Sequence, residues 1–194
     1  MTHIYFVRHA QPNCDNHDDF SRELSAKGLA DRMLAADYLR NKGVDAVLSS
    51  PYRRAVDTVS PLAQALGLEV ETVEDFRERR VDSGWIEDFD GFARRQWADF
   101  NYKRSDGESL GEAQARNLRA LSGVLERFAG QTVVIGSHGT ALSTIIHRFR
   151  PEFGFTEFER IRPIMPWIVR FDFDGRACAG IEAYNVFTRQ TEAL

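Results

Sequence analysis

Short apolar runs separated by longer amphipathic stretches make up most of the chain. Four runs, HIYFV, VDAVLS, LEVETV and QTVVIG, have the length and composition of buried β-strands. The stretches between them repeat apolar residues every three or four positions, as helices that cover a sheet do. Near the end, WIVRFDFDGRACAGIEAYN predicts two antiparallel strands around a turn at Asp174–Gly175.

Capping residues and glycines indicate where the predicted helices begin and end. Serine is a good N-cap and proline suits the first helical position, so Ser50 and Pro51 predict the start of a helix that Gly67 closes. Ser25 is expected to cap an earlier helix, closed by Gly43. That helix would turn one apolar face to the core, formed by Leu29, Met33, Ala36 and Leu39.

Two further helices are predicted in the second half of the chain. Ser109 and Glu112 have the spacing of a capping box, and Gly130 is expected to end the helix that they begin. Residues after Gly139 are expected to be helical to about Phe149.

This order of elements predicts a three-layer α/β/α fold. Strands that alternate with helices form a mainly parallel central sheet, here extended by the C-terminal antiparallel hairpin. We expect residues 1–194 to form a single domain with a lid-like excursion at about residues 76–104. In such folds, ligands bind beyond the carboxyl ends of the parallel strands. The excursion is expected to cap the pocket and set substrate choice through aromatic and basic side chains, among them Trp85, Arg94, Arg95, Lys103 and Arg104.

Overall charge and cysteine content argue against several classes of protein. A formal net charge of -4 disfavours nucleic acid or an anionic membrane as a partner. No run approaches the roughly twenty apolar residues of a membrane helix, and the first residues lack the features of a secretory signal. Cys14 and Cys178 do not make a disulfide framework. We therefore expect a reduced, cytoplasmic protein, with its oligomeric state left open.

Two histidines hold equivalent places after predicted strands. His9 follows the first strand and His138 the fourth, and each precedes a small residue, Ala10 or Gly139, which lets backbone approach closely. The carboxyl ends of parallel strands meet at one edge of a sheet, so both imidazoles are expected at one site. One such histidine would be an ordinary loop residue. Two of them, with Arg8 beside the first, favour a functional site.

Arginine and helix N-termini at the same edge favour an anionic ligand. Arg54 would lie in the first turn of the second predicted helix, where free N–H groups and partial positive charge favour anions. The helix that begins near Gly139 and Thr140 offers the same environment. A guanidinium group can grip two phosphate oxygens at once. Arg53, in contrast, is expected to be a solvated surface residue.

Four sequence strings resemble the histidine phosphatase superfamily, whose best-known branch is the cofactor-dependent phosphoglycerate mutases. They are VRHAQ, SSPYRRAVDT, FRERRVDSGW and VVIGSHG, in this order from Phe6 to about Leu142. LSAKG at residues 24–28 and GES at residues 107–109 also resemble recurrent stretches of the family. The arginine–histidine element alone is a weak signal, whereas the four strings in order are highly specific.

The resemblance implies a role for each matching residue. His9 would be the nucleophile that becomes phosphohistidine, and Arg8, Arg54 and His138 would hold the phosphoryl oxygens. Glu78 matches the carboxyl group that the family uses as proton donor and acceptor. An imidazole is a good nucleophile at neutral pH, and positioning and cationic charge supply most of what phosphoryl transfer otherwise needs. We expect neither a metal nor another cofactor.

The surroundings of these residues leave some assignments open. Arginines beside Glu78 favour the charged form of a carboxyl group, so Glu74, Asp82 and Glu87 stay open as alternatives for the acid. Family members often carry a phosphate-contacting asparagine after the first histidine, and here that stretch reads NCDN at residues 13–16. Further contacts with phosphate or substrate are expected from Gly139, Thr140, Arg79 and Arg80.

Three functions are compatible with this set of residues. The first is a phosphomonoester hydrolase acting on a small phosphorylated metabolite. The second is a mutase, which must keep water away from its phosphohistidine and usually needs more lid sequence than residues 76–104 provide. The third is a phospho-ligand binding module, which would need no nucleophile. His9, His138 and Glu78 favour an enzyme, and the short lid favours the hydrolase.

Overall fold

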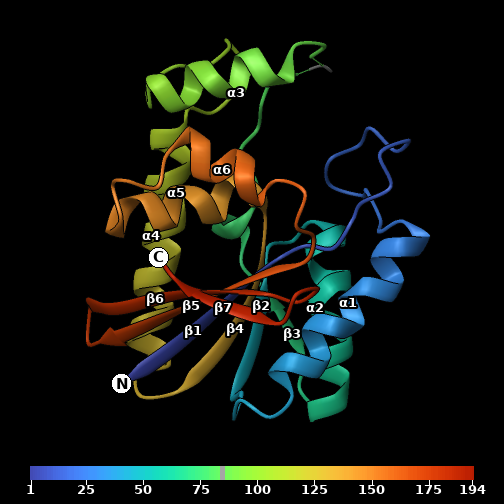
Figure 1. The fold of residues 1–194 in the computed structure, drawn as a ribbon, viewed down its shortest axis with the longest axis vertical. Helices are drawn as coiled ribbons and strands as arrows, with labels where there is room; N and C mark the ends of the chain where they lie inside the picture. The colour runs from blue at the N-terminus through green and yellow to red at the C-terminus, as the bar shows by residue number, and fades with distance from the viewer. Residues whose placement is uncertain (84–85) are drawn as a thin grey trace.

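A mixed sheet forms the centre of the computed structural model, which describes residues 1–83 and 86–194 (Figure 1). Its strands are β1 (Thr2–Arg8), β2 (Ala46–Ser49), β3 (Val70–Thr72), β4 (Thr132–Ser137), β5 (Trp167–Asp174), β6 (Ala177–Asn185) and β7 (Gln190–Ala193). They lie in the order β3-β2-β4-β1-β5-β6-β7. The first four in this order pair in parallel, and the C-terminal strands pair antiparallel.

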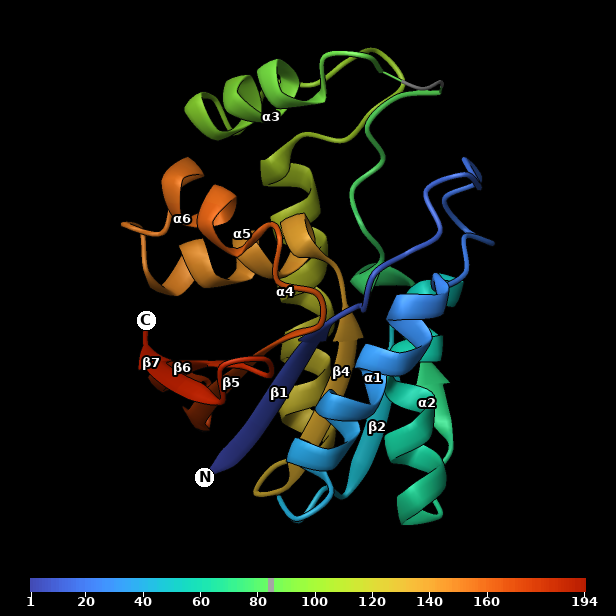
Figure 2. The ribbon, with the colours of Figure 1, turned by 45° about the vertical axis from the view of Figure 1, so that its right-hand side comes forward.

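Helices cover both faces of the sheet (Figures 1 and 2). α1 (Ala26–Leu39) and α2 (Arg53–Leu66) pack on one face, and α4 (Leu110–Arg127) and α5 (Gly139–Phe149) on the other. The short α6 (Phe155–Ile161) follows α5. After β3, the 3-10 turn η1 (Glu74–Phe76) leads toward α3 (Phe89–Ala98), which lies beyond the sheet beside α6. The predicted three-layer α/β/α fold is confirmed. None of the helices described is long and apolar enough to cross a membrane.

The alternation of side chains along β1 supplies both core layers. Successive residues of a strand point to opposite faces of its sheet. Ile4 and Phe6 accordingly pack in the core beneath α4 and α5, whereas Tyr5 and Val7 pack in the core beneath α1 and α2. A strand that is buried on both faces therefore reads as the continuous apolar run from which it was predicted.

Capping bonds confirm several of the predicted helix ends. The Ser25 hydroxyl accepts the Gly28 N–H at 3.1 Å. In α4, the Glu112 N–H donates to the Ser109 hydroxyl at 3.1 Å and the Ser109 N–H donates to the Glu112 carboxylate at 2.9 Å, which completes the capping box. α2 ends at Gly67 in the left-handed conformation, with φ of 67°.

The start of α2 differs from the prediction. The helix begins at Arg53 with Tyr52 as its N-cap residue and without a side-chain capping bond, so Pro51 is not its first residue. The Ser50 hydroxyl accepts the Tyr52 N–H at 3.2 Å and lies 2.7 Å from His138. Ser50 therefore serves the neighbouring histidine rather than the helix.

The buried face of α1 also differs from the prediction. Ala36 and Leu39 are buried as expected, but Leu29 and Met33 are 44% and 43% exposed. The helix packs through small residues instead. A Cβ atom added at Gly28 would lie 2.1 Å from the carbonyl oxygen of Gln11, so the chain passes directly over that glycine. This placement of α1 leaves Leu29 and Met33 largely exposed while Leu39 stays in the core.

The sequence pattern does not predict α6 or β7. α6 spans only two turns and carries no amphipathic repeat of useful length. β7, with sequence QTEA, is exposed at all four positions, so no apolar alternation marks it as a strand. Pairing with β6 at the edge of the sheet is what makes it extended.

Candidate active site

The carboxyl ends of β1 and β4 bring the two histidines together. β1 and β4 pair in parallel with Arg8 opposite Ser137, and His9 and His138 are the next residues. The centroids of their rings are 5.3 Å apart. Both side chains are buried, at 8% and 0% exposure. The structure thus joins at one edge of the sheet two residues that are far apart in the sequence.

Hydrogen bonds fix the orientation of His9. Its Nδ1 lies 2.7 Å from the carbonyl oxygen of Ala10, which can only accept, so Nδ1 carries the proton. The Ala10 N–H donates to the Thr58 hydroxyl at 2.9 Å, and that hydroxyl donates to the carbonyl oxygen of Arg54 at 2.7 Å. Thr58, for which sequence reasoning gave no role, therefore joins the His9 loop to the helix that carries Arg54. The remaining ring nitrogen, Nε2, keeps its lone pair.

Burial and positive charge keep both imidazoles neutral. The pKa of His9 is held well below its usual value by burial and by the neighbouring cations Arg54 and Arg8. The pKa of His138 is also held well below its usual value, by burial first, then by Arg54 and by His9. Nε2 of His138 lies 2.7 Å from the Ser50 hydroxyl. Its Nδ1 has no hydrogen-bond partner among the described residues.

Arg8 is anchored by one edge of its guanidinium group. Nη1 donates to the carbonyl oxygens of Ile161 at 2.7 Å and Ile164 at 3.2 Å, while Nε has no partner in the described part of the chain. Burial lowers the pKa of Arg8 to about 10, although Glu78 opposes this shift, so the group stays protonated at neutral pH. A Cβ atom at Gly139 would lie 3.1 Å from Nε of Arg8, which explains the need for a small residue there.

Arg54 is bound by a loop residue that the sequence does not indicate. Its Nη1 donates to the backbone carbonyl oxygen of Asp19 at 2.5 Å, and its Nη2 lies 3.2 Å from the Asp19 carboxylate. Burial lowers the pKa of Arg54, and Asp19 and Glu78 oppose that shift. The side chain of Arg54 is buried, whereas that of Arg53 is 59% exposed and pairs with Asp57. The expected exposure of Arg53 on the helix surface is confirmed, and Arg54 is buried.

Glu78 lies against the N-terminus of α5. Its Oε2 accepts the Thr140 N–H at 2.9 Å, and its Oε1 accepts the N–H groups of Ala141 at 3.0 Å and of Arg79 at 2.9 Å. The side chain is 15% exposed. A carboxylate in this place complements the partial positive charge of the helix end. Three donors give this carboxyl group a fixed orientation at the wall of the site.

The alternative acids have different surroundings. Glu74 is 70% exposed and lies 3.8 Å from Arg77, and Glu87 is exposed. Asp82 pairs with Arg104 at 3.1 Å. The two asparagines of the 13–16 stretch donate their side-chain amides to Glu23, at 2.7 and 2.9 Å. These bonds hold the loop that carries both asparagines.

Arg79 and Arg80 have contrasting environments. Arg79 is 2% exposed, and its guanidinium group donates to Gln96 and to the Thr140 hydroxyl, both at 2.6 Å. Arg80 is exposed, and its backbone N–H donates to Glu108 at 3.0 Å. Other basic residues of the 76–104 excursion lie against the protein: Arg94 stacks on Phe155, and Lys103 pairs with Glu112. Trp85 falls outside the described residues.

A cavity of about 890 Å³ opens beside these residues. Its lining includes all the predicted site residues except His138, which is fully buried beside His9. Aromatic and apolar side chains from four parts of the chain complete the wall. The predicted lining residues are Arg8, His9, Arg54, Glu78, Arg79, Arg80, Gly139 and Thr140, and the apolar ones include Phe20, Tyr52, Ile86, Phe89 and Phe158.

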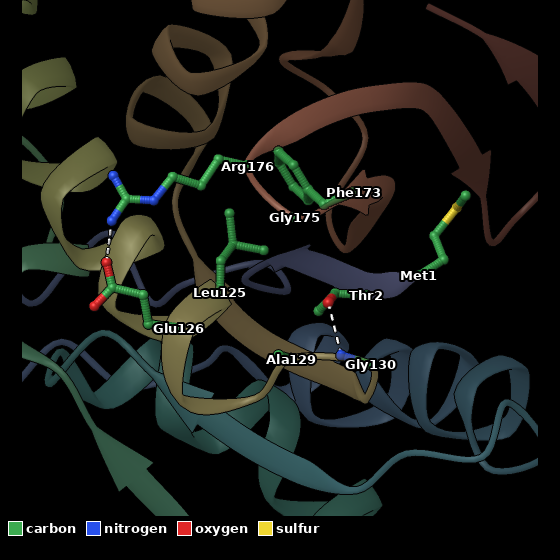
Figure 3. Close-up of a pocket in the computed structure, with 9 residues that line it drawn as sticks. All are labelled: Met1, Thr2, Leu125, Glu126, Ala129, Gly130, Phe173, Gly175 and Arg176. Atoms are coloured by element: carbon green, nitrogen blue, oxygen red, sulfur yellow. Dashed lines mark hydrogen bonds and ion pairs between the residues drawn. The ribbon is translucent and has the colours of Figure 1, made fainter.

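A smaller cavity, of about 230 Å³, lies at the opposite edge of the sheet (Figure 3). Met1 and Thr2 at the start of β1 line it, together with Gly130 just before β4. The Gly130 N–H donates to the Thr2 hydroxyl at 2.9 Å. Among the described residues, its lining includes none of the predicted site residues.

The structure thus brings a buried imidazole, two buried arginines and an oriented carboxyl group together beside one cavity. The chain belongs to branch 1 of the histidine phosphatase superfamily, whose family model matches residues 4–185. The resemblance carried by the four sequence strings is therefore confirmed.

Proteins similar to this chain include a relative named as a mutase and, among solved structures of similar fold, two named as phosphatases. The probable phosphoglycerate mutase GpmB of Salmonella arizonae is 29% identical over 160 residues, which cover 75% of this chain and 74% of that protein. Phosphoserine phosphatase from Entamoeba histolytica has a similar fold, with a TM-score of 0.75, 20% identity and coverage of 93% and 96% of the two chains. Mycobacterial glucosyl-3-phosphoglycerate phosphatase Rv2419c gives a TM-score of 0.74, 19% identity and coverage of 91% and 94%.

Proposed function

We propose that the protein hydrolyses phosphate monoesters of small metabolites through a phosphohistidine on His9. The observation that carries this proposal is the state of the His9 ring. Burial and two arginines keep it neutral, and Nδ1 is committed to the Ala10 carbonyl oxygen. Nε2 is then a nucleophile with a lone pair, in a residue that lines a cavity large enough for a phosphorylated metabolite.

In the first step, Nε2 of His9 attacks phosphorus, and the bond from phosphorus to the ester oxygen breaks. Arg8 and Arg54 would hold the phosphoryl oxygens, with His138 and the amide-rich start of α5 beside them. Their charge and hydrogen bonds stabilise the transition state without a metal ion. The departing oxygen takes a proton from the carboxyl group of Glu78, because an alkoxide is a poor leaving group.

In the second step, water attacks phosphorus and the phosphorus–nitrogen bond breaks. The Glu78 carboxylate takes a proton from that water, which returns the carboxyl group to its starting form and frees the neutral His9 ring. Inorganic phosphate then leaves the cavity. One carboxyl group thus serves as acid and then as base, as the symmetry of the two steps requires.

Access to solvent favours water over a second hydroxyl group as phosphoryl acceptor. The cavity wall includes Phe20, which is 60% exposed, and the exposed Arg80. A mutase must shield its phosphohistidine while a bound intermediate reorients. The second candidate function, a mutase, is supported by the relative named as a phosphoglycerate mutase.

A substrate screen with product analysis tests the proposal. Purified protein is incubated with a chromogenic aryl phosphate and with a set of metabolite phosphates, and released phosphate is measured. 3-Phosphoglycerate is supplied with catalytic 2,3-bisphosphoglycerate, and 2-phosphoglycerate is followed beside phosphate. We expect hydrolysis of at least one ester. Isomerisation much faster than phosphate release would favour the mutase, and binding without turnover would favour a binding module.

Treatment with a chelator tests the expected independence of metal ions. The cationic side chains of the site already supply the charge that a metal would supply. We therefore expect activity to survive prolonged dialysis against a chelator, measured on the same esters. Activity that is lost and then restored by magnesium, manganese or zinc would contradict the proposed chemistry.

A further inference from the structure

We propose that Arg79 positions the carboxyl group of Glu78 and couples it to helix α3, and that it does not grip the substrate. This inference rests on the proposed function, because it takes Glu78 as the proton donor. It assigns to the 76–104 excursion a part in the chemistry as well as in covering the cavity.

Two nitrogen atoms of the Arg79 guanidinium group bind protein partners on two elements. Nε donates to the side-chain oxygen of Gln96 in α3 at 2.6 Å, and Nη1 donates to the hydroxyl group of Thr140 in α5 at 2.6 Å. Because Arg79 is 2% exposed, these bonds are made away from water, where losing one of them is costly. Arg79 is therefore a bridge between the two helices.

Further contacts on the α3 side hold both Arg79 and Gln96 in place. The guanidinium carbon of Arg79 lies 5.5 Å from the ring centre of Phe89 and 5.7 Å from that of Phe92. Gln96 is fully buried, and its amide group donates to the carbonyl oxygens of Tyr102 at 3.2 Å and Glu108 at 3.0 Å. The Gln96 side chain that faces Arg79 is thus held by Tyr102 of the excursion and by Glu108 just beyond it.

Contacts on the α5 side connect the bridge to the acid. Thr140 binds Arg79 through its hydroxyl group and Glu78 through its backbone N–H. Arg79 binds Glu78 in turn through its own backbone N–H, at 2.9 Å. A shift of the Arg79 side chain would therefore disturb two of the three donors that orient the carboxyl group. An acid displaced by about 1 Å can lose about a hundredfold in rate.

Two esters whose leaving groups differ in basicity can show whether Arg79 positions an acid or binds the substrate. A nitrophenolate leaves readily without a proton, whereas an alkoxide needs one. In Arg79→Met we expect kcat on an alkyl phosphate to fall about tenfold to a hundredfold, with a much smaller loss on nitrophenyl phosphate. Arg79→Lys, which can reach one partner, is expected to recover part of the loss. Arg127→Met, an exposed arginine on α4, is the matched control.

Two substitutions at Gln96 test the bridge from its other end. Gln96→Glu keeps an oxygen that can accept from Arg79 and loses the amide donor, whereas Gln96→Leu loses both. We expect Gln96→Leu to slow alkyl phosphate hydrolysis selectively and Gln96→Glu to stay closer to wild type. If both variants slow the two esters equally, the contact is merely structural and the proposal fails. A raised KM for both esters in Arg79→Met would instead make Arg79 a substrate ligand, which also overturns it.

An amide-exchange measurement reads the same coupling without activity. The backbone N–H of Thr140 is hydrogen-bonded to Glu78, so it should exchange slowly with solvent in the wild-type protein. We expect faster exchange at Thr140 in Arg79→Met, and unchanged exchange in Arg127→Met. Unchanged exchange in Arg79→Met would overturn the positioning role. This result is independent of turnover, so a failed proposed function, in which no ester is hydrolysed, is distinguished from a failed coupling.

Discussion

The strand-end edge and the 76–104 excursion contribute to one cavity, but they are built by different means. At the strand-end edge, the parallel pairing of β1 with β4 sets the places of His9 and His138. In the excursion, side-chain bonds between distant residues set the positions, as with Arg79 and Gln96. Backbone pairing makes the first region rigid, and the second depends on each individual contact. Under the proposed function, the nucleophile belongs to the sheet edge, and we expect substrate choice and proton supply to depend on the excursion.

A partly buried ion-pair network holds the base of the excursion. Arg116 of α4 binds both oxygens of Glu108, each at 3.0 Å, and donates to the backbone carbonyl oxygens of Asp75 and Arg77. Glu108 also accepts from Arg77 at 3.0 Å. Burial works to raise the pKa of Glu108, but the hydrogen bonds and charge of Arg116 outweigh it and leave the pKa lowered. Removing Glu108 would leave the buried Arg116 without its counter-charge, which is costly. The network therefore holds the backbone at Asp75 and Arg77, which leads into Glu78.

The largest expected effect tests the strand-end edge with two adjacent arginines. Arg54→Met removes a buried guanidinium group that would bind the phosphoryl oxygens, and we expect kcat to fall about a hundredfold to a thousandfold. Arg53→Met changes an exposed neighbour and is expected to keep activity near wild type. Steady-state kinetics on one ester compare them directly. Similar losses in both variants would mean that position in the first turn of α2 does not decide the role.

A smaller and selective effect is expected at the border of the two regions. Glu78→Gln should slow alkyl phosphates by about a hundredfold and nitrophenyl phosphate far less, because only the alkoxide needs a proton as it leaves. The measurement is the ratio of kcat values on the two esters. Equal loss on both would indicate binding or folding, and normal activity on both would transfer the role to Glu74, Asp82 or Glu87.

The sequence predicts the strand-end edge well because its signals are local. A continuous apolar run predicts β1, and the residues that follow such a strand must lie at the edge of the sheet. The place of Arg54 at this edge is predicted from its position shortly after β2, even though α2 starts at Arg53 and not at Pro51. The four sequence strings then add the roles. In this region the local pattern and the global fold agree.

Local sequence signals do not predict the hydrogen-bond partners of these residues. Asp19 meets Arg54 across 35 positions of the sequence, and Thr140 meets Arg79 across 61. The sequence predicts that Ser50 caps a helix, but its hydroxyl group lies against Nε2 of His138. A buried ring nitrogen without a hydrogen bond is costly, whereas a helix end exposed to solvent can bind water instead. Such contacts depend on how the loops pack, which periodicity and capping rules do not encode.

The smallest expected effect concerns stability against pH at the strand-end edge. In the folded protein, burial and neighbouring cations lower the pKa values of both His9 and His138, whereas in the unfolded chain they return to about 6.5. The unfolded chain therefore binds more protons below pH 6.5, and the free energy of unfolding should fall on acidification. The slope is at most about 1.4 kcal/mol per pH unit for each histidine.

Urea unfolding at pH 7.5 and pH 5.5, in buffers without phosphate, measures this slope. His138→Gln removes one of the two groups, so we expect a shallower dependence than in the wild-type protein. Equal slopes in both proteins would mean that His138 is not held neutral by the fold. Added phosphate should raise the stability of the wild type, because a ligand that binds only the folded state stabilises it.

Trapping the phosphoenzyme tests the central claim most directly. Wild-type protein is mixed with a substrate labelled in its phosphoryl group, quenched within milliseconds in base, and digested for peptide mapping, because phosphohistidine is labile in acid and survives in base. We expect label on the peptide that contains His9, lost on brief acid treatment, and no label in His9→Ala despite an intact fold. Turnover by wild type without any label, or substantial activity retained by His9→Ala, would contradict a mechanism through phosphohistidine.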